Sequence, residues 1–305
     1  MTIRRFISGS DVMNGLRDVI GIAVLFEPHL PAVEQANALV RSLLRTRLPI
    51  FLFDGPQSEV YGDLPPSTLV YSQEYTGIQQ GHEIGRFLID RGYRKICYFT
   101  HEPGLKWSDT RLQGLENAFT SAGFTDAVSV FYAPTPGKGP VLSPTSARQM
   151  QTVDRHVAAI RKELGTSVFF DRAVSLLEEA RLDATGSWSR FIPLCVKALD
   201  LKDATAWVSA EDQIAIYALL PFLHRHKVGV PDRISIVGFN NIPESLTANL
   251  TTYDLDIPSA GLTAIDLFLF PQRRHSYMSE GNIVKRRGFI VDRGSVRRLE
   301  RHGAA

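Results

Sequence analysis

The chain has 305 residues, of which 44% are hydrophobic and 22% are charged, so it is long enough for one large or two medium globular domains. Lys and Arg number 34 against 32 Asp and Glu, which gives a formal net charge of +2. This near balance does not favour a segment that binds nucleic-acid phosphates along its length.

Short β-rich runs alternate with amphipathic helical runs, which is typical of an α/β fold built from βαβ units around mostly parallel sheets. The predicted strands span residues 20–26, 49–53, 69–72, 96–99, 128–132, 204–208, 234–239 and 288–296, with a further element at 250–257. The predicted helices span residues 31–47, 73–91, 110–122, 191–199, 213–226 and about 259–270. A long region between the strand at 128–132 and the helix at 191–199 has no assigned role.

No segment predicts export or membrane insertion. The N-terminal residues lack the features of a secretory signal, and no apolar run approaches ~20 residues. Cys97 and Cys195 lie in the apolar runs KICYF and PLCVK, where cysteine is typically a small buried hydrophobe. We therefore expect a cytoplasmic protein with no membrane partner, no metal and no cofactor.

The sequence offers no catalytic motif. Gly137-Lys138 does not fit a phosphate loop, because Tyr132 stands five residues before Gly137 and Gly139 follows the lysine. No G-x-G-x-x-G follows a strand, and the H-E-x-x-H, C-x-x-C and G-x-S-x-G patterns are missing from the sequence. We therefore do not expect an enzyme.

Two segments carry the most specific pattern in the sequence: VGVPDRISIVGFNN at 228–241 and LTTYDLDIPSAGLTAIDLFL at 250–269. They resemble a run in LacI/GalR transcription regulators that contains Val-Pro, Gly-Phe-Asp-Asp, Leu-Thr-Thr and Pro-x-x-x-Gly-x-x-Ala. Supporting matches are GRFLIDRGYRKICYFT at 85–100, the series Arg111, Gly114 and Ala118, AEDQIAIYALL at 210–220 and IVDRGS at 290–295. The resemblance covers most of residues 19–296.

The resemblance implies a two-lobed, periplasmic-binding-protein-like fold with a small effector, such as a sugar or sugar derivative, in the interlobe cleft. It implies an N-terminal lobe of residues 1–101 plus 253–272 and a C-terminal lobe of 102–252 plus 273–305, with an insertion at about 133–190. The first lobe would be incomplete, because the family's first strand, helix and second strand have no match here.

The function that the resemblance implies is allosteric sensing. In a homodimer, effector binding would change how an upstream head, absent from this chain, binds DNA. Two alternatives remain open: a sugar-type solute-binding protein, and an orphan small-molecule binding module without a DNA-binding head.

Five residues are candidate ligand contacts, the first three of them by the same resemblance. Arg111 matches an arginine whose fork grips the effector, and an exposed helix arginine is the alternative. Glu211 stands where the family usually has Asn, and Asn240 where it usually has Asp, so the pattern of charge is altered. Asp212 is either a helix N-cap or a ligand contact, and Trp107 either stacks on a sugar ring or lies in the core.

Overall fold

The computed structural model describes residues 19–25, 41–53, 70–73, 77–101, 104, 106–133, 188–280, 283–284 and 287–299. By internal contacts, the chain divides into two compact units. Unit 1 is Met1–Thr76 with Asp256–Gly288, and unit 2 is Gly77–Leu255 with Phe289–Ala305. The lobe boundaries implied by the resemblance stay a prediction. The insertion expected at about 133–190 lies, apart from its ends, outside the described residues.

Unit 2 is built on a six-stranded sheet with the order β11-β8-β7-β6-β4-β5. Every neighbouring pair is parallel except β11 and β8, which are antiparallel. Its strands are β4 (Ile96–Thr100), β5 (Val128–Tyr132), β6 (Ala206–Ser209), β7 (Ser235–Phe239), β8 (Thr251–Asp254) and β11 (Phe289–Val291). The carboxyl ends of β4, β6, β7 and β8 therefore meet at one edge of this sheet.

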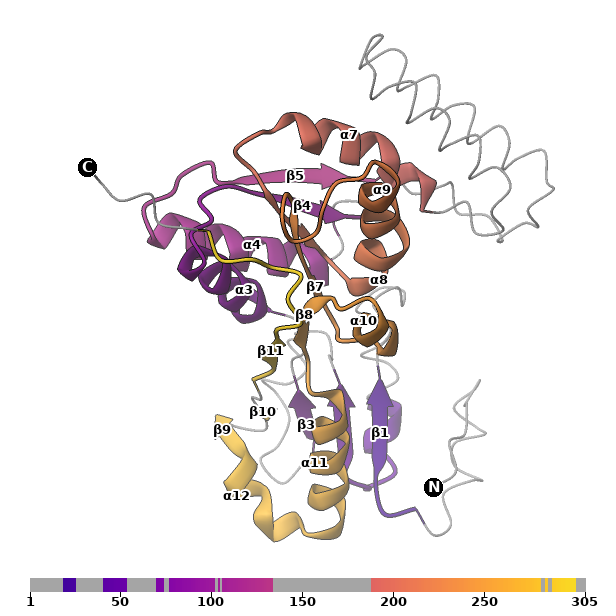
Figure 1. Ribbon diagram of the computed structural model, residues 1–305. Coiled ribbons are helices and arrows are strands. Elements are labelled where there is room, and N and C mark those ends of the chain that lie inside the picture. Colours follow the sequence, from indigo (N-terminus) through magenta and orange to yellow (C-terminus); the bar gives the residue numbers. More distant parts are fainter. Residues whose placement is uncertain are drawn as a thin grey trace, which may run out of the picture. The chain divides into compact units, whose positions relative to one another are not determined.

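Helices cover both faces of this sheet, with α3 and α4 on one side and α7 and α9 on the other (Figure 1). The helices of unit 2 are α3 (Ile78–Asp90), α4 (Lys106–Ser121), η2 (Ser189–Phe191), α7 (Ile192–Asp200), α8 (Asp212–Ile214), α9 (Leu220–Arg225) and α10 (Pro243–Thr247). A π-helical segment, Ala215–Leu219, joins α8 to α9. Pro221 explains the wider turn, because it has no N–H to offer the carbonyl four residues earlier.

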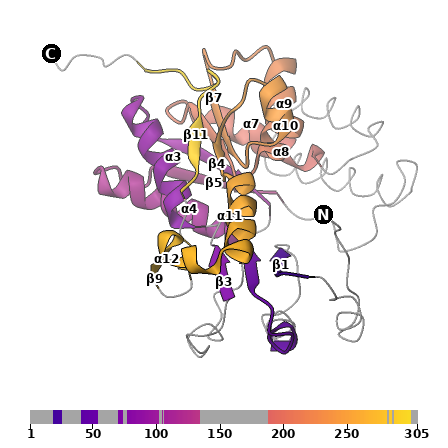
Figure 2. The same cartoon turned by 90° about the horizontal axis from the view of Figure 1, so that it is seen from below.

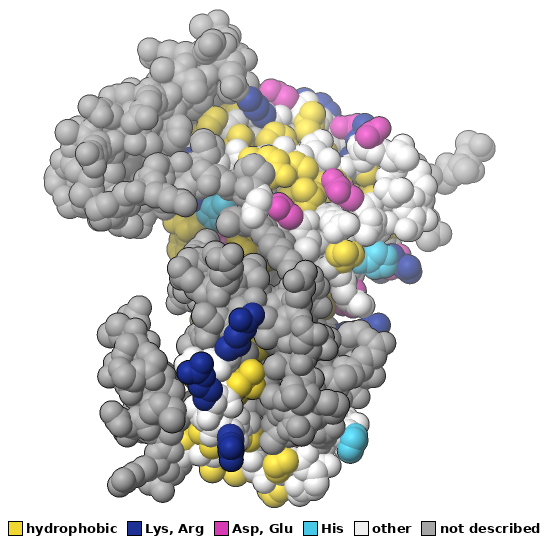
Figure 3. Space-filling view, turned by 180° about the vertical axis from the view of Figure 1, so that it is seen from behind, with side chains coloured by type: hydrophobic (Ala, Val, Ile, Leu, Met, Phe, Trp, Pro, Cys, Tyr) yellow, Lys and Arg dark blue, Asp and Glu magenta, His cyan; other side chains and the backbone are white. Residues whose placement is uncertain are grey.

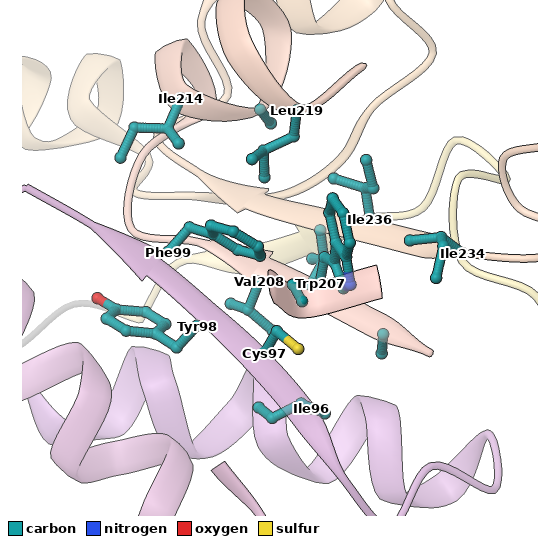
Figure 4. Packing of buried hydrophobic residues seen from close by; sticks show 14 of the residues in the cluster. Ile96, Cys97, Tyr98, Phe99, Trp207, Val208, Ile214, Leu219, Ile234 and Ile236 are labelled. Atoms are coloured by element: carbon teal, nitrogen blue, oxygen red, sulfur yellow. The ribbon is translucent and has the colours of Figure 1, made fainter. Parts of the chain in front are cut away.

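The core of unit 2 is formed by successive side chains of the central strands, which point to opposite faces. All five residues of β4 and all five of β7 are buried. Figure 4 shows Phe99 pointing toward Ile214 and Leu219, with Tyr98 on the other face of the strand. On that face, the Tyr98 hydroxyl donates to Ser108 O in α4 at 3.0 Å. Because both faces are covered, these strands are almost continuously apolar in sequence.

Small residues let α3 and α4 pack backbone against backbone. A Cβ atom on Gly81 would lie 1.9 Å from Arg111 O, and one on Gly114 would lie 2.0 Å from Ile78 O. One turn further along each helix, a Cβ on Gly85 would lie 2.5 Å from the Ala118 Cβ. Side chains at the three glycines would force the helices apart, so this spacing fixes where the backbone of Arg111 lies.

Unit 1 is smaller and holds a five-stranded sheet with the order β1-β2-β3-β10-β9. Its elements are β1 (Ile22–Leu25), β2 (Ile50–Phe53), β3 (Val70–Gln73), α11 (Ile257–Leu269), η4 (Pro271–Arg273), α12 (Arg274–Tyr277), β9 (Met278–Glu280) and β10 (Ile283–Val284). Figure 2 shows α11 beside β1 and β3. Its buried Ala264 and Leu267 pack with Phe51 and Val284, which gives this unit a core of its own.

The described surface of unit 1 carries basic side chains on one face. Figure 3 shows Lys and Arg side chains gathered there. Residues 41–44 form a helical turn, and Arg41, Arg45 and Arg47 in and after it are exposed. Within the described ranges, no helix is long and apolar enough to cross a membrane.

The α/β class and the mostly parallel sheets are confirmed. Two predicted helix starts are wrong: the helix expected from residue 73 begins at Ile78, because Gln73 still belongs to β3, and the one expected from residue 110 begins at Lys106. The last strand is shorter than predicted, since only Phe289–Val291 pairs with β8. Four short elements were not predicted from the sequence, and all of them are five residues or shorter: α10, α12, β9 and β10.

Candidate functional site

Three polar residues line up just beyond the carboxyl ends of adjoining strands in unit 2. The observed register pairs Phe99 of β4 with Ser209 of β6, and Val208 of β6 with Val237 of β7. Continued past the strand ends, this register places His101 opposite Glu211 and Glu211 opposite Asn240. We call His101, Glu211 and Asn240 the polar row. Ligands of open α/β sheets bind at this edge, so the polar row is the candidate site.

Arg111 of α4 lies against the polar row and ties two strand ends together. Its guanidinium donates from Nη1 to Ala210 O at 2.6 Å and from Nη2 to Asn240 Oδ1 at 3.0 Å. The same group lies 5.1 Å from the Trp107 ring centroid and 4.8 Å from that of Phe239. Arg111 is only 3% exposed, so the alternative of an exposed helix arginine is wrong. Its contact with an effector stays a prediction.

Asn240 reaches Arg111 because the chain turns sharply after β7. Asn240 and the next residue, Asn241, have φ angles of 106° and 51°. Short polar side chains are among the few that tolerate positive φ. The turn is held by Asn241, which donates from Nδ2 to Asp254 Oδ2 at 2.7 Å and accepts from Arg293 Nη2 at 2.6 Å. The turn thus presents the Asn240 amide oxygen to the guanidinium in a fixed position.

Asp212 lies beneath the polar row as a buried anchor. The residue at the helix N-cap is Glu211, so the predicted N-cap role of Asp212 is wrong. Its carboxylate accepts hydrogen bonds from Ser245 Oγ at 2.6 Å and from Thr252 Oγ1 at 2.7 Å. Burial raises the pKa of Asp212 to about 6. A Cβ on Gly238 would lie 2.1 Å from Asp212 Oδ1, so only glycine leaves room for this carboxylate.

His101 and Arg190 complete the site, and neither residue was predicted from the sequence. His101 Nε2 lies 2.6 Å from Glu211 Oε1, and Arg190 Nη2 lies 2.5 Å from His101 Nδ1. Arg190 belongs to η2, far from His101 in the sequence. The register of β4 against β6 is the only signal that brings His101 to Glu211, and it requires the strand order, which the sequence does not state.

Aromatic rings surround His101. The ring centroid of His101 lies 6.1 Å from that of Trp188 and 5.8 Å from that of Phe191. Trp188 also contacts Tyr217 of the π-helical segment at 5.6 Å between ring centroids. Trp107 lies in the first turn of α4 and packs against the core. Its Nε1 is buried, and within the part of the chain that the structure describes it has no hydrogen-bond partner.

The described residues of the site carry polar groups suited to hydrogen bonding, and the two cysteines of the sequence add no nucleophile to it. Burial raises the pKa of the Cys97 thiol to about 12 and that of the Cys195 thiol well above its usual range, so neither provides a thiolate at neutral pH. Among the residues that the structure describes, no three His, Cys, Asp or Glu side chains are placed to hold a metal ion. The site offers two guanidinium groups, a carboxylate, an amide, an indole and an imidazole.

Comparisons with known proteins agree with this architecture. Residues 86–296 match the family described as "Periplasmic binding protein-like domain". No curated protein sequence matches the chain.

Solved structures of LacI family transcriptional regulators share the fold. One from Weissella paramesenteroides with bound glucose has a TM-score of 0.56 at 16% identity, covering 95% of this chain and 83% of that one. One from Silicibacter pomeroyi has a TM-score of 0.53 at 17% identity, covering 90% and 99%. One from Enterococcus faecium with bound ribose has a TM-score of 0.51 at 16% identity, covering 87% and 76%.

The family match spans residues 86–296, which is more than half of the chain and includes the whole polar row, Arg111 and Asp212. A binding-protein family also agrees with the expectation that the chain is not an enzyme. The chain belongs to the periplasmic binding protein-like domain family.

Proposed function

We propose that this chain is the ligand-sensing part of a LacI-type transcription regulator that acts in the cytoplasm as a homodimer. Its effector is a sugar or sugar derivative, and it binds at the carboxyl edge of the unit 2 sheet. Arg111, Glu211, Asn240 and Trp107 contact the effector. Asp212 lies buried under the polar row and supports it through hydrogen bonds. The observation that carries this proposal is the convergence of the polar row and Arg111 at one sheet edge.

The chemistry of this edge suits a polyhydroxylated molecule. The Arg111 guanidinium is a fixed fork of donors, the Glu211 carboxylate is an acceptor, and the Asn240 amide is both. The half-buried Trp107 offers a ring face for apolar C–H groups and an N–H donor at its edge. Similar folds with bound ribose and bound glucose support this choice of ligand.

Effector binding can regulate DNA binding because the two binding equilibria are thermodynamically linked. Arg111 already connects the ends of β6 and β7 through Ala210 and Asn240. A ligand that contacts the same residues stabilises the conformation that binds it best. This proposal assigns DNA binding to a separate domain, because the near balance of charge does not favour binding to phosphates along the length of this chain. The effector would change that domain's affinity for DNA through the coupling between the two sites.

The test is calorimetric titration of the purified chain with a panel of monosaccharides that includes glucose and ribose. We expect at least one sugar to bind, and Arg111→Lys to weaken that binding by about tenfold or more, because a lysine cannot replace the planar fork. Arg86→Lys on the exposed side of α3 is the control and should leave affinity unchanged. Failure of every sugar to bind, or equal affinity for Arg111→Lys, would contradict the proposal.

A further inference from the structure

We infer that Arg190 and His101 act as a positioning pair, which fixes the Glu211 carboxylate so that it accepts a hydrogen bond from a neutral hydroxyl group of the effector. The inference rests on the proposed function for the presence of an effector. The arrangement of the pair itself is a property of the free chain.

The hydrogen bonds determine where the His101 ring carries its proton. A guanidinium only donates, so the His101 Nδ1 atom that faces Arg190 Nη2 must be the acceptor. A neutral imidazole with a bare Nδ1 carries its proton on Nε2. That proton points at Glu211 Oε1, 2.6 Å away. The order is therefore Arg190 donating to His101, and His101 donating to Glu211.

The surroundings hold this order in place. Arg190 is 7% exposed, and its guanidinium lies 5.5 Å from the Phe191 ring centroid. The rings of Trp188 and Phe191 pack around His101. The side chains of His101 and Glu211 are 17% and 20% exposed, so both are largely removed from water and yet accessible. A partly desolvated pair is oriented more firmly than a surface pair.

One oxygen of Glu211 remains for a ligand. His101 takes Oε1, and in the described part of the chain no donor reaches Oε2. An ionised carboxylate only accepts hydrogen bonds, so the ligand group that meets Oε2 must donate. A ligand carboxylate or phosphate at this point would be repelled by the like charge.

Charge then selects a neutral donor over a cationic one. Arg190 stands behind Glu211 across the His101 ring, and Arg111 donates to the carbonyl of the neighbouring Ala210. Both guanidinium groups are largely buried, where charges interact more strongly than in water. An ammonium group at Glu211 would add a third positive charge to a site that already holds two guanidinium groups. A hydroxyl donates without adding charge, so it is the group that fits.

The first experiment reads the ring directly and needs no ligand. In a sample labelled with ¹⁵N at histidine, the His101 signals are identified as those lost in His101→Gln. We expect a ring with its proton on Nε2 and none on Nδ1. A ring protonated on Nδ1, or on both nitrogens, would overturn the positioning pair.

The second experiment uses D-glucose and its monofluoro-deoxy analogues as probes. We expect His101→Gln to stay within about threefold of the parent affinity, because glutamine can accept from Arg190 and donate to Glu211. His101→Leu makes neither bond and should bind at least about tenfold more weakly. Equal affinities for the two variants, with both shown to be folded by circular dichroism, would contradict a role through hydrogen bonding.

The analogues test the hydroxyl. Fluorine cannot donate, so one analogue should bind the parent chain at least about tenfold more weakly than glucose. In Glu211→Gln, His101 donates to the amide oxygen, and the amide NH₂ group faces the ligand as a donor. The loss of affinity caused by the fluorine should therefore be several-fold smaller in this variant. An unchanged loss would overturn the assignment of the hydroxyl to Glu211. If glucose itself does not bind, the proposed sugar function and the hydroxyl assignment fall together, while the ¹⁵N measurement still decides the positioning pair.

Discussion

Replacing Gly114 by alanine is expected to lower the free energy of unfolding of unit 2 by about 3 kcal/mol or more. In most helices this change is stabilising, because alanine is the better helix former. Here the new Cβ would lie 2.0 Å from Ile78 O and 2.7 Å from His82 N, which are backbone atoms of α3. No side chain can rotate away to relieve the clash, so the two helices must separate.

Urea unfolding followed by tryptophan fluorescence measures this effect. The three tryptophans of the sequence, Trp107, Trp188 and Trp207, all belong to unit 2, so the signal reports on that unit. Gly77→Ser is the control on the same helix pair, because a Cβ there would have only Gln79 N at 3.9 Å nearby. Serine at this N-cap should keep or slightly raise stability. A Gly114→Ala chain as stable as the parent would show that α3 and α4 are not packed this closely.

The α/β fold could be predicted because its buried strands can be recognised in the sequence. Strands such as β4 and β7 are buried on both faces and therefore form continuous apolar runs. The series Arg111, Gly114 and Ala118 was visible as a resemblance, and the structure adds its physical reason, which is backbone contact with α3. Short elements such as α10 and β10 could not be predicted, because two to five residues carry too little periodicity.

The candidate site was predicted only in part, for a reason of topology. A sequence pattern predicted Arg111, Glu211 and Asn240. In the structure, Arg111 contacts Asn240, and Glu211 lies in the same row as Asn240. His101 and Arg190 carry no local signal, since a histidine in a turn and an arginine before a helix are common. Their role depends on β4 and β6 being neighbours, and the neighbour of a strand in a parallel sheet is set by tertiary packing.

Asp212 gives unit 2 a dependence of stability on pH whose sign follows from its burial. Its pKa is about 6 in the folded chain against an ordinary value of 3.8. Between these values the folded state holds a proton that the unfolded state has lost, so stability falls as pH rises. Below pH 4 both states are protonated, and above pH 6 both are ionised. A difference of about two pKa units corresponds to about 3 kcal/mol between pH 4 and pH 7.

Asp212→Asn is expected to remove this dependence, because an amide does not titrate. The amide can keep most of the network: Oδ1 accepts from Ser245 and Ile242, while Nδ2 donates to Thr252. In urea unfolding, the free energy of unfolding of the variant relative to the parent should therefore rise by about 3 kcal/mol between pH 4 and pH 7. Ser245→Ala is the matched control, since it removes a hydrogen bond that lowers the pKa and retains the carboxylate. The free energy of unfolding of that variant should be lower than that of the parent at every pH. It should also fall by a larger amount between pH 4 and pH 7, because the Asp212 pKa is raised further. Parallel curves for the parent and Asp212→Asn would mean that the carboxylate is solvated, and that Asp212 is not the buried anchor of the site.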